Sequence, residues 1–251
     1  MIRPLNDTKS CMRAIIDGCR GNAKFGNNPR LLVVYTPADD MRHQLVLCLL
    51  LAASAVFVGC SSHASIAAVE TATPIDVTPG PIKNIVSGAL EQTKTTREYT
   101  QDYFEIAYPN GDVPANTGAC TDVVIRGFRS AGVDLQKEVH EDMKANFAAY
   151  PNKWGLSKTD PNIDHRRVPN LQTYFTRKGK SLPISRNAEE YKPGDVVSWD
   201  INGRGMTHIG LVSNLRSERT GRYLVIHNIG AGVNAEDRLF DWTITGHYRY
   251  F

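Results

Sequence analysis

The stretch "NTGACTDVVIRGF", residues 116–128, leads from an irregular, glycine-containing segment into a run with apolar residues at helical spacing. Gly132 supplies a stop signal shortly after this run. The pattern predicts a helix whose first turn begins at or just after Cys120. Free backbone N–H groups and the helix dipole stabilise a thiolate at such a position, and the same groups can hold the oxygen of a tetrahedral intermediate. We therefore interpret Cys120 as a candidate nucleophile.

The composition indicates a globular protein with one main domain. The chain has 251 residues, of which 41% are hydrophobic and 22% are charged, and this is enough to bury a core. Its formal net charge is +3, and it contains no run of five or more Lys or Arg residues. Nucleic acid is therefore not an expected partner.

An export signal is predicted inside the chain, in "MRHQLVLCLLLAASAVFVGCSS" from Met41 onward. A short basic start precedes an apolar run at 45–58, which is shorter than the roughly 20 residues of a membrane-spanning helix. The end of this run, "FVGC", resembles a bacterial lipobox, and this resemblance implies lipidation of Cys60 and a periplasmic protein anchored to the outer membrane. The alternative is that 45–58 forms a buried helix of a cytosolic protein.

These features divide the chain into four predicted parts. Residues 1–40 are an upstream extension outside the fold, and 41–59 form a lipoprotein-type signal peptide. Residues 60–80, rich in Ala, Thr and Pro, are a tether, and 81–251 form the domain.

Export changes the meaning of the cysteines. With the leader removed and Cys60 lipidated, Cys120 would be the remaining free thiol. An unpaired thiol in an oxidising compartment invites mixed disulfides and oxidation, so it calls for a functional reason. The alternative is that Cys120 is a small buried apolar residue.

The periodicity of the domain changes from helical to extended along the chain. Helices are predicted over 82–90, from Cys120 to about 131, over 134–150 and over 168–179. Short β-branched and aromatic runs then predict strands over 196–201, 207–214, 223–229 and 247–251. We expect an α+β fold in which N-terminal helices pack on a small antiparallel sheet.

Two histidines lie in adjacent predicted strands. His208 opens "HIGLV", and His227 lies within "LVIHNI". Their rings could lie side by side across a hairpin, and Gly210 would leave room for a helix end to approach His208. Together with Cys120 they supply a nucleophile, a base and a residue that orients the base. The alternative is that both are structural histidines.

Several blocks resemble successive elements of the NlpC-like branch of papain-type cysteine peptidases: "GACTDVVIRGFRSAG", "KPGDVVSWD", "MTHIGLVSN" and "LVIHNIG". This resemblance covers roughly 103–251. More narrowly, "GVDLQKEVHEDM", "DPNIDHRRVPNLQTYF", "IHNIGAG" and "ITGHYRY" resemble the bacterial domain of unknown function family 1287.

The resemblance implies a papain-like, NlpC-type fold in which Cys120 is the nucleophile, His208 the base and His227 the third catalytic residue. It also implies hydrolysis of an amide bond in peptidoglycan stem peptides, with a stem peptide as partner and no cofactor or metal. The chain departs from the usual pattern at Thr121, where the family has serine, and in the long insert at 134–186.

Three further residues are candidates for substrate binding. Arg166 and Arg167 in "DHRR" could clamp the carboxylates of a stem peptide, because the guanidinium fork binds carboxylate through two hydrogen bonds. Asp122, close to the candidate nucleophile, is the third. The alternative for the arginines is a salt-bridged surface loop. No metal site is expected around His140, because consecutive helix residues do not share a face.

The expected activity is therefore that of a monomeric cysteine endopeptidase or amidase of the cell envelope. Two alternative functions also agree with the sequence. One is a catalytically inactive module that binds peptidoglycan or an envelope protein in the same groove. The other is an acyltransferase that uses the same thiol.

Overall fold

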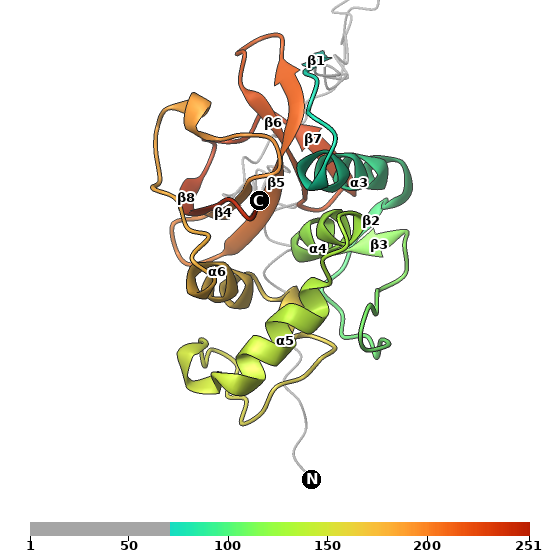
Figure 1. Ribbon diagram of the computed structural model, residues 1–251, viewed down its shortest axis with the longest axis vertical. Coiled ribbons are helices and arrows are strands. Elements are labelled where there is room, and N and C mark those ends of the chain that lie inside the picture. The colour runs from blue at the N-terminus through green and yellow to red at the C-terminus, as the bar shows by residue number, and fades with distance from the viewer. Residues whose placement is uncertain (1–70) are drawn as a thin grey trace, which may run out of the picture. The chain divides into compact units, whose positions relative to one another are not determined.

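The computed structural model describes residues 71–251. The predicted extension at 1–40, the signal peptide at 41–59 and the lipidation site Cys60 lie outside the described residues. Within these residues the fold is α+β, as expected, with helices on one side of a large antiparallel sheet (Figure 1). None of the helices in 71–251 is long and apolar enough to span a membrane.

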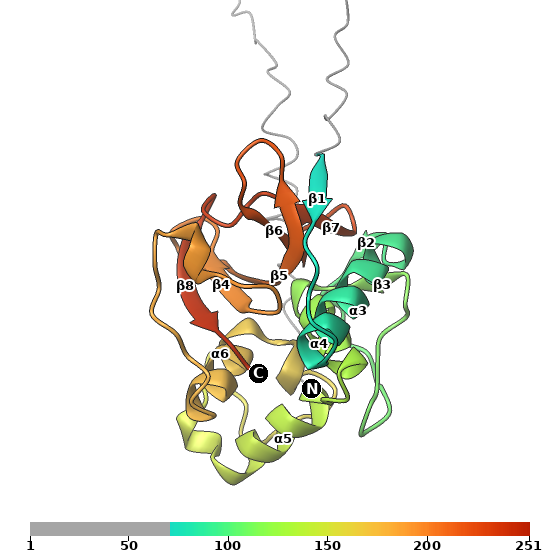
Figure 2. The same ribbon diagram turned by 45° about the horizontal axis from the view of Figure 1, so that its top comes forward.

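The helical elements occupy the first two thirds of the described chain. The α-helices are α3 (Pro81–Thr95), α4 (Cys120–Ser130), α5 (Leu135–Ala145) and α6 (Val168–Arg177). Three single turns of 3₁₀-helix accompany them: η1 (Phe147–Ala149), η2 (Asp164–Arg166) and η3 (Ala188–Glu190). Helices α3 and α4 lie side by side, and both pack against the sheet (Figure 2).

The strands form one large sheet and one short parallel pair. The large sheet has the order β7-β6-β5-β4-β8, with β1 paired to β5, and all its pairs are antiparallel. Its strands are β1 (Ala72–Pro74), β4 (Val196–Asp200), β5 (Thr207–Ser217), β6 (Tyr223–Asn228), β7 (Val233–Glu236) and β8 (Thr243–Tyr248). The pair β2 (Glu98–Tyr99) and β3 (Thr117–Gly118) lies just before α4.

Alternate residues of each strand point to opposite sides of the large sheet, and packed side chains cover both of its faces. The helices pack on one face, against the buried residues Val196, Ile209, Leu211 and Ile226. A smaller cluster covers the other face and contains Val197, Trp199, Val212, Val225, Tyr191 and Leu239. Because it is covered on both faces, the centre of the sheet can hold buried polar side chains in fixed positions.

Helix α5 is shorter than the helix predicted over 134–150. Asp134 caps its start by accepting a hydrogen bond from the Gln136 amide at 3.1 Å. The helix ends at Ala145, because the backbone of Asn146 leaves the helical region and its side chain donates to the Asp142 carbonyl at 3.0 Å. One 3₁₀ turn, η1, then leads to Pro151.

The sheet is also larger than the predicted one. The segment predicted as a tether over 60–80 contains strand β1, in which Ala72 pairs with Ser217, so the fold begins before residue 81. Strand β7 was not predicted, and β8 begins at Thr243 rather than at residue 247. Strands of three or four residues are too short to show a two-residue period, so only pairing with a neighbour reveals them.

Candidate active site

Cys120 is the first residue of α4, as the sequence predicts. The preceding residue, Ala119, is extended, and its amide donates to Asp122 Oδ2 at 2.6 Å. This contact caps the helix from within its first turn. The Cys120 side chain is nearly buried, with 5% exposed, and it lines an open pocket. The residue also belongs to the hydrophobic cluster between the helices and the sheet.

Asp122 and Arg166 form a buried ion pair beneath this helix start. Arg166 Nε donates to Asp122 Oδ1 and Arg166 Nη2 to Oδ2, both at 3.0 Å, and Nη1 donates to the Asp102 carbonyl at 2.8 Å. The Arg166 and Asp122 side chains are 2% and 3% exposed. Because their charged groups are already paired inside the protein, the structure favours a structural role for both over the predicted substrate binding.

The two candidate histidines are in direct contact. His208 Nε2 lies 2.9 Å from His227 Nδ1, and both rings are buried. Strands β5 and β6 bring them together, and a Cβ at Gly210 would lie 2.8 Å from the Ile226 carbonyl and 3.1 Å from His227 Cβ. Glycine is therefore needed at 210 for this close approach of β5 and β6.

Aromatic side chains enclose the histidine pair. Trp242 packs edge-on against both rings, with centroid distances of 5.5 Å to His208 and 5.8 Å to His227. Trp199 lies 5.8 Å from His208 and donates its indole N–H to the Leu239 carbonyl. These contacts place the rings beside the cluster on the face of the sheet that the helices do not cover.

The backbone amide of Ile209, the β5 residue next to His208, acts to lower the pKa of the Cys120 thiol. Within residues 71–251, no hydrogen bond joins the sulfur to the His208 ring. The structure therefore forms the predicted histidine pair but not the predicted thiol–imidazole contact: Cys120 packs in the cluster on the helix face of the sheet, and the rings lie beside the cluster on the other face.

Burial sets the protonation of the resting groups. Burial raises the pKa of the Cys120 thiol to about 12, although the amides of Ile209 and of the helix start act in the opposite direction. Burial, together with the neighbouring His227, lowers the pKa of His208 to about 3. Near pH 7 the resting site therefore holds a neutral thiol and a neutral imidazole.

The pocket at Cys120 has a volume of about 400 Å³. Thr207, which precedes His208, lines it together with Cys120, whereas the buried His208 is not among its lining residues. Two exposed aromatic side chains, Tyr103 and Trp154, form part of its walls. An extended ligand with apolar and polar parts could therefore lie across the thiol.

Tyr99 is a further member of the site that the sequence pattern does not reveal. Burial raises its pKa above the ordinary range, and the negative charge that Cys120 carries when ionised acts in the same direction. Its hydroxyl accepts a hydrogen bond from Gln101, which also lines the pocket. The β2–β3 pairing places Tyr99 opposite Gly118, two residues before Cys120, and no local spacing signal could have shown this contact.

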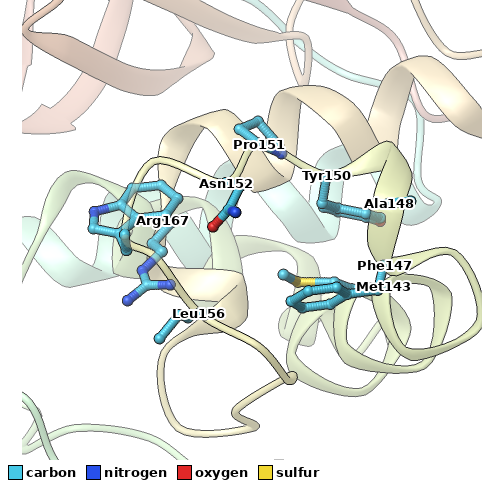
Figure 3. A pocket seen from close by; sticks show the side chains of 9 residues that line it. Met143, Phe147, Ala148, Tyr150, Pro151, Asn152, Leu156 and Arg167 are labelled. Atoms are coloured by element: carbon cyan, nitrogen blue, oxygen red, sulfur yellow. The ribbon is translucent and has the colours of Figure 1, made fainter.

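Arg167, unlike Arg166, forms no ion pair with a carboxylate of the described residues. Its guanidinium stacks on the Trp154 ring at 4.1 Å, and its buried Nη1 atom has no hydrogen-bond partner among residues 71–251. It lines both the Cys120 pocket and a neighbouring pocket of about 260 Å³. Figure 3 shows this second pocket, in which Arg167 lies across from Met143 and Phe147. The arrangement suits a ligand with an anionic group beside an apolar one.

The remaining histidines of interest lie elsewhere and have structural contacts. His140 Nδ1 lies 3.0 Å from Asp164 Oδ2, and His247 Nε2 lies 2.8 Å from Asp195 Oδ2. Burial lowers the pKa of His165 to about 3. Within 71–251, no group of three or more His, Cys, Asp or Glu side chains is arranged to hold a metal ion.

Comparison with known proteins identifies a relative and a family for most of the described chain. The chain is 55% identical over 167 residues to the uncharacterized protein YijF of Escherichia coli (strain K12), an alignment that covers 66% of this chain and 80% of the relative. No solved structure is significantly similar to the chain. The family model described as "Domain of unknown function (DUF1287)" matches residues 86–250. The chain therefore belongs to the DUF1287 family.

Proposed function

We propose that this protein is a cell-envelope cysteine hydrolase with a papain-like, NlpC-type fold, which cleaves an amide bond in peptidoglycan stem peptides. One observation carries the proposal: a cysteine at a helix start lines an open pocket together with Thr207, the strand residue next to a hydrogen-bonded histidine pair. These are the parts that nucleophilic catalysis by cysteine requires.

The proposed reaction proceeds through an acyl-enzyme. His208 accepts the proton of the Cys120 thiol while the sulfur attacks the substrate carbonyl and forms a tetrahedral intermediate. His208 then gives the proton to the leaving amine, the C–N bond breaks and a thioester remains. A water molecule, deprotonated by His208, attacks the thioester, and the carboxylic acid and the thiol are released.

Both resting groups are neutral, and the gap between a thiol pKa of about 12 and an imidazole pKa of about 3 opposes transfer of the thiol proton before substrate binds. Because both partners are uncharged, the thiol proton would move to His208 as the sulfur attacks, without a preformed thiolate–imidazolium pair. The step needs the sulfur and the imidazole to come into contact, so the proposal requires a side-chain movement when substrate binds. The backbone amides of Cys120 and Thr121, at the start of α4, act on the Cys120 thiol and would hold the developing oxyanion of the substrate.

A stem peptide carries carboxylates that the Arg167 guanidinium could bind, and it occurs where the protein is expected to be located. Arg167 would bind a carboxylate of the stem peptide, and the exposed rings of Tyr103 and Trp154 would pack against its apolar parts. The signal predicted at 41–59 and the lipidation predicted at Cys60 would deliver the enzyme to the periplasm, anchored to the outer membrane, where this substrate occurs.

Incubation of residues 61–251 with purified sacculi tests the proposal. Mass analysis of the soluble fragments should show new termini produced by amide cleavage, and the Cys120→Ala variant should release none. Glu91→Gln, a change on the exposed side of α3, is a matched control and should cleave like the unmodified protein. Undiminished cleavage by Cys120→Ala would remove the mechanism.

A second candidate function is binding without catalysis. It is favoured by the raised pKa of Cys120 and by the lack of a hydrogen bond between its sulfur and His208 in the described residues. In this case sacculi would retain the protein, no new fragments would appear, and Arg167→Met would weaken retention whereas Cys120→Ala would not. The same two variants therefore separate the two functions.

A further inference from the structure

The outer ring nitrogen of His227 is buried and has one charged neighbour. This atom, Nε2, points away from His208 and belongs to a side chain that is 1% exposed. It lies 3.1 Å from Glu236 Oε2, an ion-pair distance, although the alignment falls outside hydrogen-bond geometry. No other partner for this nitrogen exists among the described residues, so Glu236 alone can satisfy it.

Strand pairing holds the Glu236 carboxylate in this position. Strands β6 and β7 lie side by side, and Glu236 pairs with Val225 while His227 pairs with Asn234 (Figure 2). Arg238 Nε lies 3.4 Å from the same Glu236 oxygen. The contacts with His227 and Arg238 hold the pKa of Glu236 below its usual range, so the group carries a negative charge at neutral pH.

A carboxylate at this position selects one arrangement of protons in the histidine pair. If His227 carries its proton on Nε2, that proton faces the carboxylate, and the bare Nδ1 accepts a hydrogen bond from His208 Nε2. His208 Nδ1 then carries no proton and can accept one. In the opposite arrangement, a bare His227 Nε2 would face the negative charge, and this is unfavourable.

We infer that Glu236 is a positioning residue, the fourth in a series after Cys120, His208 and His227, and that it leaves His208 Nδ1 free to accept the thiol proton. This inference rests on the proposed function for its catalytic consequence. Its structural content, the position of two protons, can be measured without any activity.

Two-bond ¹H–¹⁵N NMR correlation of the imidazole groups in residues 61–251 tests the proton positions, because it distinguishes protonated from bare ring nitrogens. In the unmodified protein at pH 7, we expect protons on Nε2 of both His208 and His227. Glu236→Leu should lose this arrangement and give a proton on His227 Nδ1 or a mixture, and Glu236→Gln should be intermediate. Glu189→Gln, which alters another glutamate paired with an arginine, should leave the spectrum unchanged.

The activity consequence is measured separately on soluble muropeptides. Glu236→Leu should lower kcat by about 10- to 100-fold, as loss of an orienting partner does in other sites, with little change in KM. A proton on His227 Nδ1 in the unmodified protein, or an unchanged proton arrangement in a folded Glu236→Leu variant, would overturn the inference. Absence of cleavage by the unmodified protein would instead count against the proposed function, since the NMR result does not depend on it.

Discussion

His208 Nε2 and His227 Nδ1 lie 2.9 Å apart, on neighbouring strands of a sheet that is covered on both faces. A contact between two buried rings requires one to donate and the other to accept, so the pair has a defined direction. That direction determines which nitrogen of His208 can act as a base.

The first prediction concerns Gly210. A methyl group at this position would lie 2.8 Å from the Ile226 carbonyl, so Gly210→Ala should push β5 away from β6. We expect a loss of about 1–3 kcal/mol in the free energy of unfolding, the usual cost of overpacking. Urea denaturation measures this loss, and Gly203→Ala, in an open turn with left-handed backbone, reports the cost of backbone strain alone. An unchanged stability for Gly210→Ala would contradict the close approach.

The second prediction concerns the reactivity of Cys120, the sole cysteine in 61–251. Because burial raises the pKa of its thiol to about 12, iodoacetamide should label it more slowly than free cysteine at pH 7. The labelling rate should continue to rise up to pH 10 without a plateau. Mass spectrometry measures the rate, and a plateau below pH 8 would show a stabilised thiolate instead.

The third prediction separates a structural role from substrate binding at Asp122 and Arg166. Removing either partner leaves a buried charge unpaired, so Asp122→Asn or Arg166→Met should each cost about 3–5 kcal/mol of stability. The exposed pair of Glu189 and Arg216 is the matched control, and Glu189→Gln should leave the stability nearly unchanged. Stable variants with a raised KM would restore the substrate-binding interpretation.

The fourth prediction concerns Arg167, whose Nη1 has no partner among the described residues. If this arginine binds a substrate carboxylate, Arg167→Met should lose about 1.5–3 kcal/mol of binding. This corresponds to a rise in KM of roughly tenfold or more with little change in kcat. Soluble muropeptides provide the assay, and Arg186→Met, an exposed arginine elsewhere, should leave KM unchanged. An unaltered KM for Arg167→Met would exclude the role.

The fifth prediction concerns stability in acid. The folded protein keeps His208 and His165 neutral down to a pKa of about 3, whereas unfolded histidine titrates near 6.5. The unfolded chain therefore binds more protons between these values, and the free energy of unfolding should fall as the pH falls from 6.5 toward 3. Each histidine contributes up to about 1.4 kcal/mol per pH unit.

Urea denaturation between pH 7 and pH 4.5 measures this slope, in a range where most carboxylates remain ionised. His165→Leu should make the slope smaller, whatever it does to stability at pH 7, because one of the two titrating groups is removed. A slope that is equal in the two proteins would mean that His165 is protonated in the folded state.

The sequence by itself determined the features that depend on neighbouring residues. The apolar spacing and glycine stop around Cys120 predicted α4 correctly, and the two-residue period predicted the strands that carry His208 and His227. These two predictions also placed the thiol at the helix start and the two imidazole rings next to each other. Helix starts and strand periods depend on short stretches of sequence, so they can be predicted before the fold is known.

Only the tertiary structure decided which partners these residues meet. Arg166 contacts Asp122 across 44 positions of sequence, and Tyr99 reaches the Cys120 region through a two-residue parallel pair. Glu236 lies on β7, a strand too short to show a period. Such contacts arise from packing between distant segments, and burial then sets the protonation of Cys120 and His208. No local sequence pattern predicts these long-range contacts or these changes in protonation, because both depend on how the whole domain packs and excludes water.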